Sequence, residues 1–267
     1  MKIGFAGVGN MAQAIINGLL EQPESAYSLY GFAPSGPKSP TSKWQRVQWL
    51  ASNFELAQTV DLLVLAVKPH MIKTVLGELQ DVPKLPLLVS LAAGTTTATI
   101  RDCCRDDQLN GIARVMPNTP SAVGAGMSGL FATEQTNAEG KQAIETIFQS
   151  VGSTLWLADE DQFHALTAIS GSGPAYYFMF TAALIEAGQA AGLSQAQAHQ
   201  LAIATAHGAG QLMQQSDVDP KTLQQQVTSP NGTTHAATTS LAANQLTDII
   251  TQAVEAARLR SIELSNN

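Results

Sequence analysis

Residues 4–15 read GFAGVGNMAQAI, and this stretch decides the fold. An apolar run over residues 2–6 leads into it, and apolar residues at helical spacing follow it. Gly7, Gly9 and Ala12 occupy the three small positions of the dinucleotide-binding fingerprint, in which alanine is an accepted third residue. The glycines permit a tight turn and a close approach of backbone to a pyrophosphate. The helix N-terminus then offers free N–H groups and a favourable dipole to that anion.

Further apolar runs predict a sheet behind this motif. The expected strands cover residues 28–32, 60–67, 85–94, 111–117 and, after a helix at 138–150, 154–157. Strands that alternate with helical segments predict a doubly wound, mostly parallel α/β domain of the Rossmann type. From about residue 160 the chain is rich in Ala, Gln and Leu and has helical periodicity. We therefore predict a dinucleotide-binding domain over 1–157 and an all-α dimerisation domain over 158–267.

Composition narrows the partners and the location. A net charge of −7 over 267 residues argues against nucleic acid or an anionic membrane as partner, because both need a basic face. Only 13% of the residues are charged, which favours a chain that hides surface in a subunit interface. The N-terminus lacks a signal-peptide pattern, and Glu186 and Gln189 break the most apolar stretch. With Cys103 and Cys104 read as reduced thiols, we expect a soluble, cytoplasmic protein.

The stretch after the second expected strand bears on the choice of nicotinamide cofactor. NAD enzymes usually place Asp or Glu about 20 residues beyond the glycines, on the ribose 2′-hydroxyl. Here no acid follows that strand until Glu55, whereas Ser35 and Lys38 offer a hydrogen bond and a charge to a 2′-phosphate. The alternative is that this loop is merely solvated. We predict NADP(H) as the preferred cofactor, with NAD(H) as the second choice.

Neither a catalytic metal nor a protein nucleophile stands out. The five histidines show no close pairing with cysteine or carboxylates, and no G-x-S-x-G occurs. The reactive group is therefore expected to be the hydride of the cofactor. AVKPHM (66–71) and ARVMPNTPSAVGAG (113–126) leave expected strands at the carboxyl end, where open α/β sheets bind ligands. AISGSGPAYYF (168–178) predicts a glycine/serine turn that feeds a helix, with Pro174 in its first turn.

Six stretches carry a family resemblance. In chain order they read GFAGVGNMAQAI, LAVKPHM, SLAAGTTTATI, ARVMPNTPSAVGAGMSGL, LTAISGSGPAYYF and VTSPNGTTHAATTSL. Over nearly its whole length the chain resembles the Δ1-pyrroline-5-carboxylate reductases. The resemblance implies NAD(P)H-dependent reduction of Δ1-pyrroline-5-carboxylate to L-proline. It also implies a helical domain that interlocks with a partner subunit in a homodimer or a ring of dimers. The active site then lies between the nicotinamide end and helical elements partly supplied by the partner.

The same resemblance assigns residues to the cofactor. Those expected there, beside Ser35 and Lys38, are Gly7, Val8, Gly9, Asn10, Met11, Ala12, Asn53, Ala66, Val67, Lys68, Pro69, Ala92, Ala93, Met116, Pro117 and Asn118. Asn53 is expected near the adenosine ribose, and Lys68 with Pro69 near the nicotinamide ribose.

Residues 227–241, VTSPNGTTHAATTSL, are expected to bind the substrate carboxylate. They contain no acid, and they offer threonine hydroxyls and the backbone N–H groups of a helix start. The substrate-binding candidates are Glu160, Ser229, Asn231, Gly232, Thr233 and Thr234, with Thr234 and Thr167 as the side chains nearest the chemistry. Asn231 replaces the usual glycine, but asparagine tolerates positive φ. Glu160 either favours the iminium by its charge or belongs to a solvated acidic run.

Two other functions fit the same plan of a nucleotide domain and a helical domain. A β-hydroxyacid dehydrogenase needs a lysine on the helical domain as acid and base, where the chain offers Lys221. A nucleotide-sensing dimer without turnover would keep the scaffold, and Asn231 and the unusual loop at 33–43 are its support.

Overall fold

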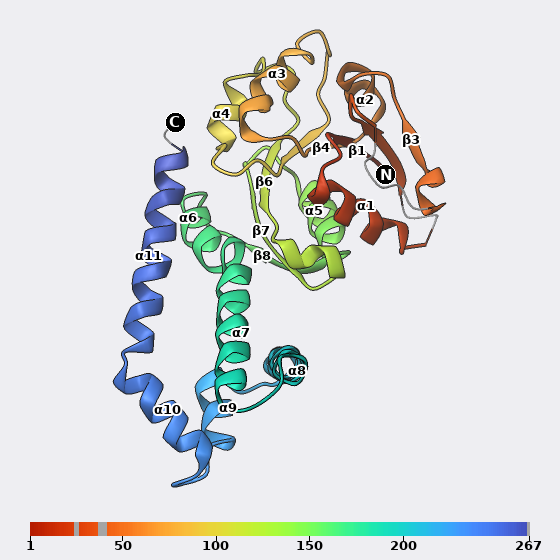
Figure 1. Ribbon diagram of the computed structural model, residues 1–267. Coiled ribbons are helices and arrows are strands. Elements are labelled where there is room, and N and C mark those ends of the chain that lie inside the picture. The colour runs from red at the N-terminus through yellow and green to blue at the C-terminus, as the bar shows by residue number, and fades with distance from the viewer. Residues whose placement is uncertain (24–26, 37–41, 266–267) are drawn as a thin grey trace. The chain divides into compact units, whose positions relative to one another are not determined.

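The computed structural model describes residues 1–23, 27–36 and 42–265. Within them the contacts form two compact units (Figure 1). One comprises Met1–Ser172 and the C-terminal segment from Ala257, and the other comprises Gly173–Ala256. The first unit therefore keeps a short helical piece beyond its last strand. The domain limits of 1–157 and 158–267 remain predictions from the sequence.

Over the described residues, an eight-stranded sheet forms the middle of the first unit, in the order β3-β2-β1-β4-β5-β6-β7-β8. The strands are β1 (Lys2–Ala6), β2 (Ser28–Phe32), β3 (Val47–Trp49), β4 (Leu62–Leu65), β5 (Leu87–Ser90), β6 (Ile112–Met116), β7 (Gly126–Ala132) and β8 (Gly152–Trp156). β6 and β7 pair antiparallel, and the other neighbouring pairs are parallel. This confirms the predicted doubly wound, mostly parallel sheet.

Helices cover both faces of this sheet (Figure 1). They are α1 (Asn10–Leu20), α2 (Asn53–Thr59), α3 (Ile72–Gly77), α4 (Thr97–Arg101), α5 (Ala138–Gln149) and α6 (Gln162–Leu166), with short 3-10 turns η1 (Ser42–Arg46), η2 (Pro69–Met71) and η3 (Thr119–Val123). One apolar cluster joins α1 and α5 to the sheet, and a second joins α2, α3 and α4 to the opposite face. Strands β4 and β5 are buried throughout, as expected of apolar runs in a parallel sheet.

Three local features differ from the sequence prediction. Strands β3 and β7 were not predicted, because β3 is very short and glycines interrupt the apolar pattern of β7. The predicted glycine/serine turn at 168–178 is wrong. Residues Thr167–Gly171 form a π-helix, η4, that continues α6 and leads through Ser172 into α7 (Gly173–Ala190). Pro174 does lie in the first turn of α7, as predicted.

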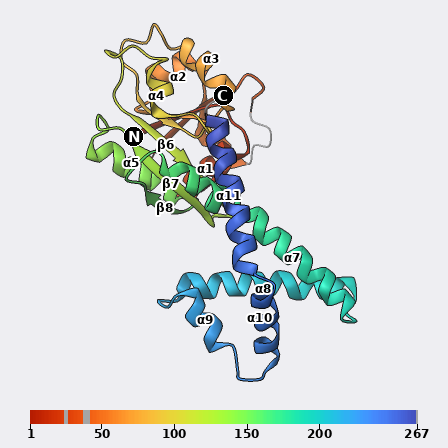
Figure 2. The same cartoon turned by 90° about the vertical axis from the view of Figure 1, so that its left-hand side faces the viewer.

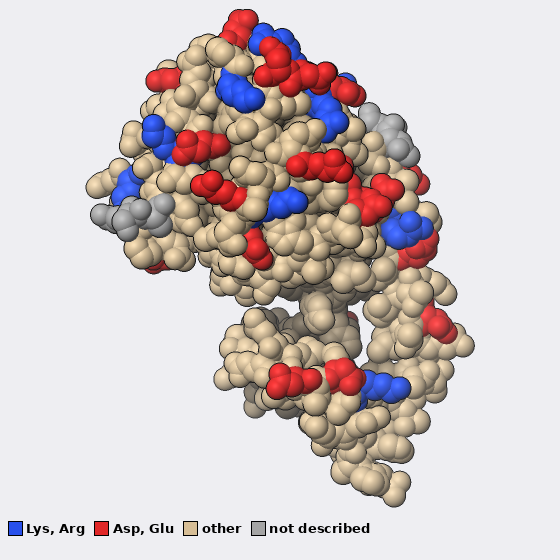
Figure 3. Space-filling model, turned by 180° about the vertical axis from the view of Figure 1, so that it is seen from behind, with Lys and Arg blue, Asp and Glu red and all other residues tan. Residues whose placement is uncertain are grey.

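Beyond the sheet the described chain is helical, as predicted. The second unit contains α7, α8 (Gln195–Gln215), α9 (Pro220–Gln226), α10 (Thr233–Ala243) and the first part of α11 (Leu246–Ser265) (Figure 2). Phe178 and Phe180 on α7 are 68% and 50% exposed. Figure 3 shows few charged side chains on this helical unit. The single chain thus leaves apolar helix surface uncovered, which marks an interaction face.

None of the described helices combines the length and the hydrophobicity that crossing a bilayer requires.

The close approach of β7 and β8 predicts that Gly152→Ala is strongly destabilising. Gly152 has φ +147°, and a Cβ there would overlap the backbone oxygen of Gly126. We expect a loss of more than about 2 kcal/mol in the free energy of unfolding, measured by urea denaturation. Gly77→Ala is the control, because no atom of the described chain lies within 4 Å of that Cβ. Gly77 lies in helix α3, so alanine there should add about 0.5–1 kcal/mol. Equal stability of the two variants would contradict the prediction.

Candidate active site

The turn from β1 into α1 requires its first glycine. Gly7 has φ +86°, and a Cβ there would lie 2.7 Å from Val67 Cγ1 and 2.9 Å from the backbone oxygen of Ala66. Its amide donates to the backbone oxygen of Phe32 at 2.9 Å, which ties the turn to the neighbouring strand. A left-handed residue without Cβ is therefore needed at this point.

The second glycine faces open space. Gly9 is the N-cap of α1, and no atom of the described residues lies within 4 Å of the position of its Cβ. In the same part of the chain no side chain caps α1, and its first turn holds no acid. Ala12 is 1% exposed, which fits close packing of helix and strand. The start of α1 thus leaves backbone N–H groups available to an anion, and the predicted contact of this turn with the pyrophosphate stays a prediction.

Parallel pairing brings the other predicted cofactor segments to the same edge of the sheet. Strands β1, β4, β5 and β6 run in one direction, so their carboxyl ends share an edge. The segments at or just beyond the carboxyl ends of these strands contain Gly7–Ala12, 66–69, 92–93 and 116–118. Strand order reverses at β1, where the chain continues to β2 on one side and β4 on the other. Ligands bind at such switch points in open α/β sheets.

The residues predicted to bind the adenosine side of the cofactor differ in their burial. Ser35 is exposed in the turn after β2, and Lys38 lies outside the described residues. Asn53 begins α2 and is 5% exposed, with its Nδ2 donating to Glu78 Oε2 at 2.8 Å. Its Oδ1 is buried and has no hydrogen-bond partner within the described chain. Such an orphaned acceptor fits a hydroxyl donor of a ligand.

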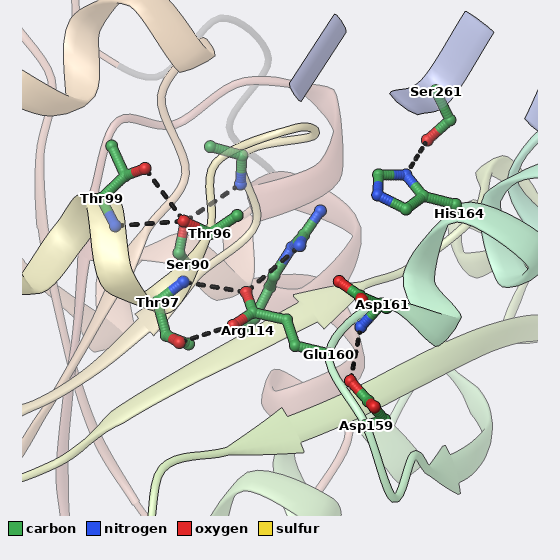
Figure 4. Close-up of polar contacts among 11 residues, drawn as sticks. Ser90, Thr96, Thr97, Thr99, Arg114, Asp159, Glu160, Asp161, His164 and Ser261 are labelled. Carbon is green, nitrogen blue, oxygen red and sulfur yellow. Dashed lines mark hydrogen bonds and ion pairs between the residues drawn. The ribbon is translucent and has the colours of Figure 1, made fainter. Parts of the chain in front are cut away.

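Glu160 is not part of a solvated acidic run. Its side chain is 17% exposed and accepts three hydrogen bonds. Two come from Thr97, from the backbone N at 2.8 Å and from Oγ1 at 2.6 Å, and one comes from Arg114 Nη1 at 3.2 Å (Figure 4). The neighbouring Asp159 and Asp161 are exposed. The predicted contact of Glu160 with substrate stays a prediction, and the three bonds already hold its carboxylate.

Arg114 is a residue that sequence reasoning missed. It lies on β6, its side chain is 6% exposed, and its guanidinium lies 4.4 Å from the ring centre of Phe163. Burial lowers the pKa of this guanidinium below its usual value, and the charge of Glu160 opposes that shift. The signal was a lone arginine inside the apolar strand IARVM, since a buried arginine calls for a buried acid.

The π-helix is fixed to the carboxyl edge by Asn118. The side-chain Nδ2 of Asn118 donates to the backbone oxygen of Ser170 at 3.1 Å, and its Oδ1 accepts from the backbone N of Met127 at 2.9 Å. Thr167, half-buried, opens the π-helix, and its backbone oxygen accepts from Ser172 N at 2.8 Å. π-Helical turns are frequent at functional sites. Thr167 therefore lies in the helical segment that Asn118 fixes at the predicted cofactor edge.

The C-terminal signature has the predicted turn. Asn231 takes φ +58°, in the left-handed region that asparagine tolerates. Gly232 is the N-cap of α10, and a Cβ there would overlap Ser229 Oγ. In the described chain no side chain caps α10, and its first turn, which begins with Thr233 and Thr234, holds no acid. The backbone N–H groups of this turn can therefore bind an anion.

Cys104 is not an activated nucleophile. Both cysteines are free, and burial, with a contribution from Cys103, raises the pKa of the Cys104 thiol to about 11. Only a small fraction of such a thiol is ionised near neutral pH. Among the residues described, no group of three His, Cys, Asp or Glu side chains is arranged to hold a metal ion.

Comparisons with known protein families match both parts of the chain. Residues 160–264 match the family model described as pyrroline-5-carboxylate reductase dimerisation. Residues 2–94 match the model described as NADP oxidoreductase, coenzyme F420-dependent.

Individual relatives are similar over the full length. The chain is 39% identical to a pyrroline-5-carboxylate reductase of Pseudomonas aeruginosa, over 99% of this chain and 97% of the relative. A solved pyrroline-5-carboxylate reductase from Coxiella burnetii is 37% identical with a TM-score of 0.89, and the match covers 98% of each chain. A Plasmodium falciparum pyrroline carboxylate reductase, solved with NADP bound, is 30% identical with a TM-score of 0.84, over 99% of this chain and 98% of that one.

The bonds of Asn118 predict that Asn118→Ala loosens the π-helix. We expect faster amide hydrogen exchange over residues 167–172. The free energy of unfolding should fall by about 1–3 kcal/mol, because the backbone groups of Ser170 and Met127 lose their hydrogen-bond partner. Asn137→Ala is the matched control, since Asn137 accepts from Gly140 N at 2.8 Å and caps α5. The Asn137 variant should lower the free energy of unfolding by about 1 kcal/mol and leave amide exchange over residues 167–172 unchanged. The same exchange rate in the Asn118 variant and in the wild type would refute the assignment.

Proposed function

Since the chain belongs to the pyrroline-5-carboxylate reductase family, we propose that it catalyses the NADP(H)-dependent reduction of Δ1-pyrroline-5-carboxylate to L-proline. The observation that carries the proposal is full-length similarity to reductases of that name, combined with an anion-binding turn at the sheet's switch point. This reaction is the last step in making proline.

The residues at the carboxyl edge fit the cofactor. The open face of Gly9 and the uncapped start of α1 receive the pyrophosphate, and the buried Oδ1 of Asn53 accepts from a ribose hydroxyl. Ser35 and Lys38 are assigned to the 2′-phosphate, with NADH as the second choice of cofactor. The segments 66–69, 92–93 and 116–118 line the nicotinamide half. NADPH, when bound, supplies the hydride that reduces the C=N carbon.

The start of α10 binds the carboxylate of the substrate in this proposal. Backbone N–H groups at 231–234 and the hydroxyls of Ser229, Thr233 and Thr234 are the donors, and residues 227–241 hold no acid that would repel an anion. Thr234 and Thr167 are the side chains that we assign to the substrate ring. An imine that binds already protonated needs no strong general acid, so these residues act by positioning and electrostatics.

Self-association follows from the dimerisation family and the uncovered apolar side chains of α7. We assign a homodimer as the working form, with a ring of dimers as the larger assembly. A partner subunit supplies part of the helical elements of the site. Two free cysteines fit the reducing cytoplasm, where we place the protein.

A turnover assay tests the proposal and separates it from the alternatives. Purified protein should oxidise NADPH only when Δ1-pyrroline-5-carboxylate is present, with one proline formed per NADPH consumed. Oxidation of 3-hydroxy acids without activity on the imine would instead support a β-hydroxyacid dehydrogenase, whose required lysine would be Lys221, exposed on α9. Tight NADPH binding without turnover of the imine would support a nucleotide sensor.

The open face of Gly9 predicts that Gly9→Ala weakens cofactor binding while the fold is kept. The new methyl meets no atom of the described chain, but it occupies the space assigned to the pyrophosphate. We expect the Kd for NADPH, measured by fluorescence titration, to rise at least about tenfold, or about 1.4 kcal/mol. Stability should fall by no more than about 1 kcal/mol, since alanine is a poorer N-cap. An unchanged Kd would place the pyrophosphate elsewhere, and Gly77→Ala is the control that should leave Kd unchanged.

The start of α10 predicts that the hydroxyl of Thr234 contributes to turnover. Thr234→Val keeps the shape and removes one hydrogen bond to a charged ligand. That loss costs about 1.5–3 kcal/mol, or roughly ten- to a hundredfold in kcat/KM for the imine. The Kd for NADPH should not change. Thr238→Val, one turn further along, is the control. The hydroxyl of Thr238 donates to the backbone oxygen of Thr234 at 2.9 Å and is not assigned to the substrate. Similar kinetics for the two variants would mean that the backbone N–H groups at 231–234, and not the Thr234 hydroxyl, bind the substrate carboxylate.

A further inference from the structure

The helical segment 162–171 is held at both ends against the sheet of the first unit. At its start, the ring of Phe163 lies under the guanidinium of Arg114 on β6. At its end, the backbone oxygen of Ser170 accepts from Asn118, just beyond the carboxyl end of the same strand. Between them, a Cβ on Gly129 would overlap Leu166, so the helix lies directly on β7. The segment therefore runs along β6 toward the predicted nicotinamide edge.

Glu160 joins three separate parts of the chain at the start of this segment. Its carboxylate accepts from the backbone N and the hydroxyl of Thr97, which follows the 92–93 segment, and from Arg114, which precedes the 116–118 segment (Figure 4). The carboxylate thus joins the start of the helical segment that carries Thr167 to α4 and β6, the elements next to two cofactor-side segments.

A gain in folding stability alone does not explain the buried ion pair of Glu160 and Arg114. An apolar pair of similar volume is often as stable as a buried ion pair, because desolvation of the two charges offsets their attraction. A carboxylate that accepts two bonds from Thr97 and one from Arg114 does, however, fix direction as well as distance. The guanidinium of the arginine in turn lies over the ring of Phe163, at 4.4 Å from the ring centre. Such a pair fixes the helix start in one position and orientation.

We infer that Glu160 and Arg114 are positioning residues for the reduction, which align the helix bearing Thr167 with the nicotinamide edge without touching the substrate. The inference rests on the proposed function, because it assigns the aligned groups to imine and cofactor. It also replaces a direct role of Glu160 at the iminium with an indirect one.

The first test is Glu160→Gln in the full-length enzyme. Gln keeps the shape but loses the charge and one acceptor oxygen. Misplacement of reacting groups by about 1 Å costs up to about a hundredfold in rate. We expect kcat to fall by about ten- to a hundredfold, while the Kd for NADPH changes less than about threefold, because the hydrogen bonds of the Glu160 carboxylate go to Thr97 and Arg114 and not to Gly7 or Gly9. Amide exchange over residues 162–172 should become faster.

A second set of variants separates positioning from stability. Glu160→Gln leaves the Arg114 charge buried and unpaired, which lowers Tm. The double variant Glu160→Gln/Arg114→Met removes that charge and packs a thioether on Phe163, so Tm should recover toward the wild type while kcat stays low. Ile144→Ala is the stability control. Ile144 is fully buried on the face covered by α1 and α5, so its variant should lower Tm and keep the wild-type kcat.

The outcomes distinguish this inference from the proposed function. A wild-type enzyme that does not turn over the imine refutes the proposed function, and the exchange measurement still decides whether Glu160 tethers the helix. With an active wild type, Glu160→Gln with normal kcat and a lowered Tm would overturn the inference. If that variant does not fold, Glu160→Asp keeps the charge but is one methylene too short to reach both partners. Its kcat should fall at least about fivefold at a near-normal Tm, and a wild-type kcat would overturn the inference equally.

Discussion

The left-handed turn at Gly7 is the constraint on which the rest of this structure depends. At φ +86° the chain leaves the middle strand β1 and enters α1 directly, and contact with Ala66 and Val67 leaves no room for a side chain. The helix start therefore lies over the carboxyl ends of the central strands. Because β1, β4, β5 and β6 are parallel, each following segment arrives at that same edge. The position of the cofactor site therefore follows from the parallel direction of these four strands.

The antiparallel strand β7 reverses the direction of the chain, and this reversal determines where the helical segment after the sheet lies. Had β7 been parallel to β6, its connection would have needed a crossover of a dozen or more residues. Instead a short connection through η3 turns the chain back beside β6, with Gly124 at φ +72° ending that turn. Strand β8 then pairs with β7, and the chain leaves it close to Arg114. This reversal is what lets the segment 162–171 run along β6 toward the cofactor edge.

Local signals in the sequence predicted the features that local physics determines. The fingerprint at Gly7, Gly9 and Ala12, the buried runs of β4 and β5, and the left-handed turn at Asn231 each depend on residues next to one another in the chain. The π-helix at Thr167–Gly171 could not be predicted in this way, because glycine and serine favour a turn until Asn118 supplies a distant bond.

The pair of Arg114 and Glu160 depends likewise on tertiary contacts. Glu160 stands in the acidic run DEDQ, which by itself indicates a solvated surface. The partners that bury it come from β6 and α4, which are 46 and 63 residues away in sequence. The lone arginine of β6 signalled a buried acid but not which one. The sequence pattern can thus indicate a buried arginine, and the topology of the sheet selects the acid that pairs with it.

The choice of helix caps explains how a chain of net charge −7 can bind two anionic ligands. The N-caps of helices α2, α5, α8 and α9 are Ser52, Asn137, Ser194 and Asp219, whose side chains accept from backbone N–H groups of the first turn. The N-caps of helices α1 and α10 are Gly9 and Gly232 instead, and the first turns of these helices hold no acid. A capping side chain would satisfy the N–H groups that an anion needs. At the ends assigned to pyrophosphate and carboxylate, glycine leaves those donors free, so the backbone provides the positive potential that few lysines supply.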